Sequence, residues 1–151
     1  MKLSTRSRYG TRILLELARH SDRIPVQVSA ISRQQDIPVK YLEQLIRTLK
    51  KAGLISSVRG AKGGHILARE PAAISLGAIV RLFEEQHELV KCISSPDLCD
   101  MADDCRVRLA WKEATEALYE RLDGITIADL LCEPPSPRPA KKAKPKRVKT
   151  T

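Results

Sequence analysis

Aromatic side chains are scarce in this 151-residue chain, because Phe, Trp and Tyr together make up only 3% of it. Its core must therefore be built mainly from Leu, Ile, Val and Ala, which suits the packing of helices against one another. Long apolar runs are also missing, and no stretch approaches the roughly 20 residues that a membrane span needs. Arginines interrupt every apolar run of the first 20 residues, unlike in a secretory signal peptide. We expect a cytoplasmic protein that does not bind membranes.

Acidic residues are nearly missing from the first half of the chain. Residues 1–69 carry 14 Lys and Arg against 4 Asp and Glu, residues 70–133 carry 6 against 14, and residues 134–151 carry 7 against none. A basic first half can displace counterions from the phosphates of nucleic acid, whereas the acidic middle would repel those phosphates. A chance arrangement of solvated charge is the alternative. The basic tail over 133–151 cannot bury apolar surface, so we expect it to be disordered.

A forty-residue run, Val28 to Leu67, has the order of a winged helix-turn-helix. A helix over residues 5–20 precedes it. Ser29 is predicted to cap a short helix, and a longer basic helix with apolar residues at i, i+3, i+4 and i+7 follows: Leu42, Leu45, Ile46 and Leu49. Gly53 is suited to end that helix in a left-handed conformation. Two strands, over 54–58 and 65–69, flank a glycine-rich basic turn at 59–64. The pattern predicts a mainly α fold with one small β-hairpin.

The basic helix leaves a polar face that can contact the bases of a DNA duplex. In the major groove, Gln44 suits adenine, Lys40 or Arg47 suits guanine, and Tyr41 suits a phosphate or a thymine methyl group. Glu43 either accepts from cytosine or repels phosphates. Arg59 and Lys62 are the charges of the hairpin turn, and Arg59 suits a narrow minor groove. The alternatives are an ordinary solvated helix face and a winged helix that contacts only proteins.

The second half of the chain is predicted to hold a sensor loop and a dimerisation helix. A capped helix over 75–85 would complete a DNA-binding domain at 1–85, followed by a cysteine-containing loop at 86–104. A helix from Cys105 and a final helical turn would fill 105–132. Its apolar residues alternate steps of four and three, which is typical of a seam between two helices: Val107, Trp111, Ala114, Leu118 and Leu122. We therefore expect a homodimer.

Three cysteines, Cys92, Cys99 and Cys105, lie within or beside that loop. Clustered cysteines in a cytoplasmic protein point to metal or redox chemistry, since stable structural disulfides are uncommon there. Thiolates are the usual ligands of iron–sulfur clusters, and three in one loop can converge without a rigid spacing. An iron–sulfur cluster is the favoured interpretation. A thiol redox switch, a zinc site and inert thiols are the alternatives. Cys132 is taken as a residue near the end of the fold.

Several stretches of the sequence closely resemble the IscR-like family of bacterial winged-helix regulators, with its IscR, NsrR and CymR types. The resemblance rests on MKLSTRSRYGTRILLELA, on YLEQLIRTLKKAGLISSVRGAKGGHILAR and on the cysteine triplet, and it covers nearly all of residues 1–131. It implies a homodimer, joined by the long helix, that binds a pseudo-palindromic operator, usually as a repressor. It also implies that Tyr41, Gln44 and Arg59 contact DNA, and that the position of Glu43 adjusts operator choice.

The fourth ligand of a cluster is where this sequence departs from the family pattern. The IscR type has a histidine three residues after the last cysteine, where this chain has Arg108. The NsrR type has an aspartate near the N-terminus, where this chain has Arg8. Neither arginine can bind iron. The candidates left open are Asp100, Asp103, Asp104, Glu88, His87, Cys132 or no protein ligand. A 2Fe–2S cluster is favoured over a 4Fe–4S cluster.

The sequence therefore predicts a dimeric, sequence-specific transcriptional regulator that binds a double-stranded DNA operator, acts as a repressor and responds to an iron–sulfur cluster. The alternative is a cluster-free regulator that uses thiol redox chemistry or a partner protein, like the cysteine-metabolism regulators. A general nucleic-acid coat based on the basic tail is a further possibility. An enzyme is not expected, because no serine motif or phosphate loop is present and the histidines lie in different elements: His20, His65 and His87.

Overall fold

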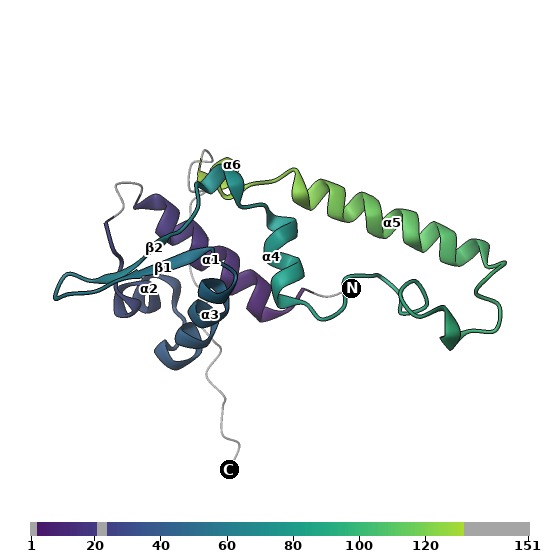
Figure 1. The fold of residues 1–151 in the computed structure, drawn as a ribbon, viewed down its shortest axis with the longest axis horizontal. Helices are drawn as coiled ribbons and strands as arrows, with labels where there is room; N and C mark the ends of the chain where they lie inside the picture. Colours follow the sequence, from purple (N-terminus) through teal and green to yellow (C-terminus); the bar gives the residue numbers. More distant parts are fainter. Residues whose placement is uncertain (1–2, 21–23, 132–151) are drawn as a thin grey trace, which may run out of the picture.

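The structure is a computed structural model that describes residues 3–20 and 24–131. It consists of a compact head and a long arm, as Figure 1 shows. The helices of the head are α1 (Thr5–Arg19), α2 (Val28–Gln35), α3 (Val39–Lys51), the 3-10 turn η1 (Pro71–Ala73), α4 (Leu76–Phe83) and α6 (Ile127–Leu131). Its strands are β1 (Ile55–Val58) and β2 (Gly64–Leu67). The arm is α5 (Arg106–Asp123), which follows a loop containing the 3-10 turn η2 (Pro96–Leu98).

The core of the head forms around α1, which packs against α4, α6, α3, α2 and β2. Ser4 caps this helix, because its side chain accepts a hydrogen bond from the amide of Ser7. The helix buries one apolar stripe that includes Ile13 and Leu14. The fully buried residues around it come from the other helices of the head and from the segments that connect its elements: Ile31, Ile37, Leu42, Leu49, Ile74, Ile79 and Ile127. Aliphatic side chains supply most of this core, as the scarcity of aromatic residues predicts.

Helices α2 and α3 form the predicted helix-turn-helix. The turn runs through Asp36, which has a positive φ of 55° and ends α2 in the left-handed conformation. Ser32 stabilises the turn by donating its hydroxyl to the carbonyl of Ile37 at 2.6 Å. The prediction that Ser29 caps α2 is wrong, since the helix begins at Val28 and Gln27 occupies the N-cap position without a side-chain hydrogen bond. The short helix therefore depends on packing of Ile31 and not on a cap.

Strands β1 and β2 pair antiparallel, with Ile55 opposite Leu67 and Val58 opposite Gly64. The turn between them contains Gly60, whose φ of +116° favours glycine. The hairpin is fixed to the segment before α2 near its turn end, because Val26 and His65 exchange two backbone hydrogen bonds of 2.9 Å. A Cβ atom at Gly64 would lie 2.5 Å from the Val26 carbonyl oxygen, so only glycine permits this approach. The hairpin is the wing that the sequence predicts.

Helix α4 connects the head to the arm. It begins at its predicted cap, Ser75, but ends at Phe83, two residues before the predicted end. Arg81 donates both Nη1 and Nη2 to the carboxylate of Asp123 at 2.7 Å each, and these hydrogen bonds lower the pKa of Asp123 below its ordinary value. The guanidinium of Arg81 also lies 4.5 Å from the ring centroid of Tyr119. We call these three residues the α4–α5 joint.

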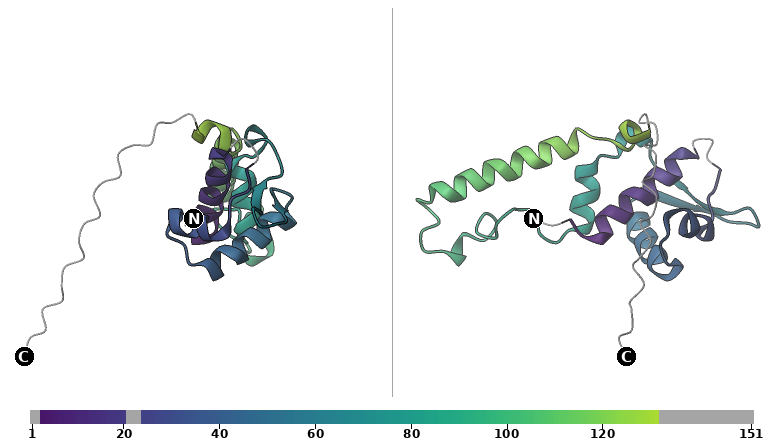
Figure 2. Two further views of the ribbon diagram at one scale, coloured as in Figure 1. Left: turned by 90° about the vertical axis from the view of Figure 1, so that its left-hand side faces the viewer. Right: turned by 180° about the vertical axis from the view of Figure 1, so that it is seen from behind.

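The arm exposes large apolar side chains. Val107, Leu109 and Trp111 are 63%, 57% and 45% exposed, although side chains of this kind are usually buried. Val107 and Trp111 lie four positions apart and share one face of the helix, whereas Leu109 lies on another. The right-hand view of Figure 2, which shows the molecule from behind, also has α5 projecting from the head, with the loop that contains η2 beside it. Within the described ranges, no helix has the length and apolar character needed to cross a membrane. Cys132 and the basic tail over 133–151 lie outside the described residues.

Candidate DNA interface and cysteine loop

Helix α3 divides into a buried face and an exposed polar face. Its apolar residues Leu42, Leu45, Ile46 and Leu49 are all buried in the head. This burial fixes the rotation of the helix, because residues three and four apart share one face. The predicted reading residues Lys40, Glu43, Gln44 and Arg47 are exposed, and Tyr41 is half-buried. The apolar repeat therefore dictates which side chains a partner of the head would meet.

The exposed side chains of α3 and of the wing have few partners within the protein. Among the described residues, Lys40, Gln44 and Arg47 make no side-chain hydrogen bond or salt bridge, and Arg59 and Lys62 in the wing turn make none either. Nearby carboxylates therefore do not neutralise these charges. Unpaired donors on a rigid helix are what recognition of base edges and phosphates requires.

Tyr41 is held by residues that sequence reasoning did not single out for this role. Its ring meets that of Tyr9 edge to face, with the centroids 6.1 Å apart. The Arg12 guanidinium lies 5.3 Å from the Tyr9 centroid and donates to both the side chain and the carbonyl of Gln35, at 2.9 and 2.6 Å. Helix α1 thus orients Tyr41 and ties itself to the end of α2. The signal in the sequence was weak, since Tyr9 resembles any core residue of an amphipathic helix.

A groove of about 630 Å³ lies between α3, the start of α2 and strand β2 of the wing. Three of the residues that line it are basic and one is acidic: the lining comprises Val28, Glu43, Ile46, Arg47, Lys50, Lys51 and His65. Burial lowers the pKa of His65, and the charge of Lys50 lowers it further, so this histidine is neutral at neutral pH. The positive charge of the groove therefore comes from the lysines and Arg47. A positive charge is what attracts the phosphate backbone of a nucleic acid.

The loop that precedes α5 lies at the far end of the molecule from the wing (Figure 1), and it contains the three predicted cysteine ligands. Cys92 is half-buried and Cys99 is exposed. Cys105 is the N-cap of α5, and its sulfur accepts from the amide of Arg108 at 3.4 Å. All three are free thiols. Across the described residues, no three His, Cys, Asp or Glu side chains are gathered closely enough to hold a metal ion.

The candidates for a fourth ligand differ in their surroundings. Asp100, Asp103 and Asp104 are exposed, whereas Glu88 is half-buried. His87 packs on α5, with its ring centroid 6.2 Å from that of Tyr119, and its Nδ1 is buried without a hydrogen-bond partner. His87 is therefore part of the contact between the loop and the arm.

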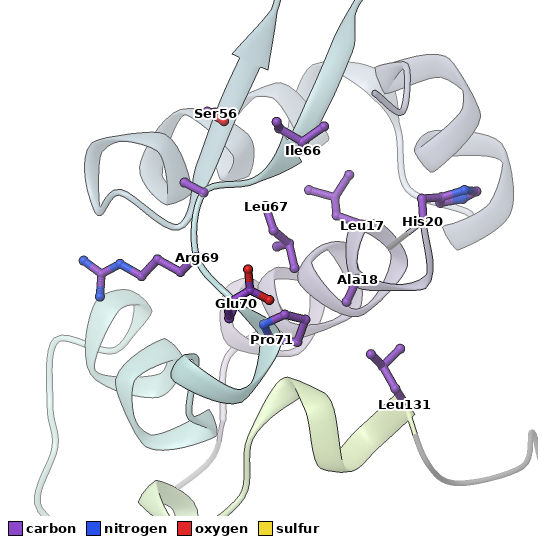
Figure 3. Close-up of a pocket in the computed structure, with 11 residues that line it drawn as sticks. Leu17, Ala18, His20, Ser56, Ile66, Leu67, Arg69, Glu70, Pro71 and Leu131 are labelled. Atoms are coloured by element: carbon purple, nitrogen blue, oxygen red, sulfur yellow. The ribbon is translucent and has the colours of Figure 1, made fainter. Parts of the chain in front are cut away.

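A separate cavity of about 550 Å³ opens between the end of α1, β2, η1 and the end of α6. Figure 3 shows Leu17, Ile66 and Leu67 converging on it, while the imidazole of His20 points away. The Nε2 of that histidine lies 3.5 Å from a carboxylate oxygen of Glu16. The cavity is therefore lined mainly by apolar side chains that extend the core, and its one histidine belongs to a pair on α1.

The fold defines a winged helix-turn-helix protein, and the exposed basic side chains of its head suit a nucleic-acid partner. The chain belongs to the Rrf2 family, whose model, described as an iron-dependent transcriptional regulator, matches residues 3–133. Members of this family are transcriptional regulators and not enzymes. The predicted fold class, family and absence of enzymatic activity are thus confirmed.

The relatives include protein rrf2 of Nitratidesulfovibrio vulgaris, which is 46% identical over 131 residues that make up 87% of each chain. Among solved structures, T. potens IscR is 38% identical with a TM-score of 0.67, and the alignment covers 87% of this chain and 86% of that one. CymR, described as the global cysteine regulator of B. subtilis, is 36% identical with a TM-score of 0.72 over 86% of this chain and 95% of that one.

Proposed function

We propose that this chain is a dimeric, sequence-specific regulator that represses transcription, and that an iron–sulfur cluster on Cys92, Cys99 and Cys105 modulates its affinity for DNA. One observation carries the proposal. The unpaired polar face of α3 belongs to the head, and the free thiols lie in the loop beside the far part of the arm, the helix that would join two subunits. As a gene regulator it would act in the cytoplasm.

Recognition of DNA is assigned to α3 and the wing. Gln44 would contact adenine and Lys40 or Arg47 guanine, because these side chains present the matching donors and acceptors. Tyr41, held by Tyr9, would contact a phosphate or a thymine methyl group, and Glu43 would tune the sequences that are tolerated. Arg59 and Lys62 would extend from the wing to the neighbouring groove.

Dimerisation is assigned to the apolar face of α5. Val107 and Trp111 belong to the predicted heptad seam and are exposed in the single chain, so a second copy of α5 would bury them. Two heads joined in this way read two half-sites that are spaced by the helical repeat of DNA. The distance between the reading heads then depends on the angle of α5, which the α4–α5 joint fixes relative to each head.

The donor set suits an iron–sulfur cluster in its chemistry. Three free thiols share one loop, and thiolates are the ligands that such clusters prefer. Because the side chains are not gathered in this conformation, the loop has to close around the cluster. A bound cluster would supply a redox-sensitive centre, with 2Fe–2S favoured over 4Fe–4S. Closure of the loop would act on α5 through Cys105 at its N-cap and through the contact between His87 and Tyr119.

The test is anaerobic purification of the full chain, with assays of iron and sulfide and a visible absorbance spectrum. Operator affinity is then compared between cluster-loaded and cluster-free protein at fixed salt. We expect visible-range absorbance, and affinities that differ. Cys99→Ala should abolish the difference, and Ser95→Ala, an exposed neighbour, should preserve it. Colourless protein whose affinity changes on thiol oxidation would favour a cluster-free redox switch, and equal affinities in all states would eliminate the sensor.

A further inference from the structure

Arg108 occupies the first turn of α5 and binds the cysteine loop at two places. Its Nε donates to the carbonyl of Cys92 at 2.8 Å, and its Nη2 donates to that of Ile93 at 3.5 Å. Its Nη1 donates to the carbonyl of Ala102 at 3.1 Å. The side chain is half-buried, and Ala102 is buried. One guanidinium therefore connects both ends of the loop segment 92–102 to the helix of the arm.

The same residue also contacts two of the three predicted ligand residues. Cys92 accepts from the Arg108 side chain through its carbonyl oxygen, and Cys105 accepts from the Arg108 amide through its sulfur. A guanidinium has five N–H donors in a fixed plane and no acceptor, so it can hold carbonyl groups in a defined arrangement but cannot bind iron itself. Lysine has no such fork and cannot reproduce the geometry.

We propose that Arg108 is a positioning residue that organises the cysteine loop for cluster binding and links the loop to α5. It stands at the position where the resemblance to the IscR type predicts a histidine ligand, and it replaces a bond to iron with hydrogen bonds to the loop backbone. The inference rests on the proposed function, because it assigns Arg108 a role in holding the cluster. A change in the loop is thereby transmitted to the helix that sets the spacing of the two heads.

The first test measures how fast the cluster-loaded full chain loses iron to a chelator under anaerobic conditions. The inference requires that the loop keeps the hydrogen bonds from Arg108 when it closes around the cluster. Because hydrogen bonds to a charged group contribute more than neutral ones, losing them from a half-buried site should then speed release about tenfold. We expect this acceleration in Arg108→Ala, a smaller one in Arg108→Lys, and none in Arg106→Ala, which removes an exposed charge from the same turn. The visible spectrum of Arg108→Ala should keep its maxima, because the ligands are unchanged. Equal release rates in Arg108→Ala and Arg106→Ala, or shifted maxima in Arg108→Ala, would overturn the inference.

The second test needs no cluster and uses alkylation of the thiols in cluster-free protein. We expect Arg108→Ala to raise the alkylation rate of the half-buried Cys92 severalfold, while the exposed Cys99 reacts as in the parent protein. Circular dichroism checks that the variant is folded. A parent chain that binds no iron would contradict the proposed function, but the difference in Cys92 alkylation would still show that Arg108 holds the loop. Unchanged reactivity of Cys92 in a folded variant would show that Arg108 does not hold the loop.

Discussion

Replacement of Arg59 by alanine should reduce DNA affinity in a way that depends on salt. Arg59 is exposed at the wing turn and has no salt-bridge partner among the described residues, so the fold should be unaffected. Each phosphate neutralised on duplex DNA contributes about 0.9 to the slope of log affinity against log salt. A dimer has two wings, and the slope should therefore fall by about 1.8.

That change in slope translates into a measurable ratio. When salt rises fourfold, from about 50 to about 200 mM, the advantage of the parent protein over Arg59→Ala should shrink by about twelvefold. Fluorescence anisotropy with a labelled operator, repeated over a salt series, measures both slopes. Arg106→Ala is the matched control, since it removes the same charge from the start of α5, at the opposite end of the molecule. If both variants keep the parent slope, the wing does not contact the phosphate backbone.

Three further predictions concern specificity, packing and pH. Gln44→Ala should cost about 1–3 kcal/mol on the preferred operator and little on random DNA, and equal losses on both would refute its role in base recognition. Gly10→Val should destabilise the head by about 1–3 kcal/mol in denaturant unfolding, because a Cβ there would lie 2.3 Å from the Phe83 ring; unchanged stability would contradict this packing. Although burial raises the pKa of Glu84, hydrogen bonds from Ser7 and Ser4 outweigh it and lower the pKa. The ionised Glu84 therefore stabilises the fold above the ordinary pKa of a carboxyl group, and this stabilisation is lost as the pH falls through the lowered pKa. Ser7→Ala should accordingly unfold at a higher pH than the parent protein in an acid titration. An unchanged midpoint would show that the hydrogen bond from Ser7 is not stabilising.

The elements of the head could be predicted because each has a local signal. The spacing of Leu42, Leu45, Ile46 and Leu49 defines both the length and the buried face of α3, and burial of all four confirms it. Gly53 follows the end of α3 with a φ of +67°, in the left-handed conformation that the sequence predicts. The cap of α2 was mispredicted, because a serine near a helix start is a common signal and the real start at Val28 depends on packing of the helix against the core.

The contacts that organise the sites could not be predicted, since they join residues far apart in the sequence. Arg81 and Asp123 are separated by 42 positions and Ser7 and Glu84 by 77, and no pattern of residue types indicates which charges will meet. Arg108 illustrates the limit most clearly. The sequence shows that it cannot bind iron, but only the fold shows that its guanidinium holds the loop backbone.

The most direct test is a random-oligonucleotide selection with the full-length parent protein, in parallel with a Gln44→Ala, Arg47→Ala double variant. We expect the parent to enrich a pseudo-palindrome whose half-sites are about one helical turn apart, and the double variant to bind DNA without that preference. A parent protein that enriches no sequence, or a double variant that enriches the same one, would contradict recognition of DNA by the exposed face of α3.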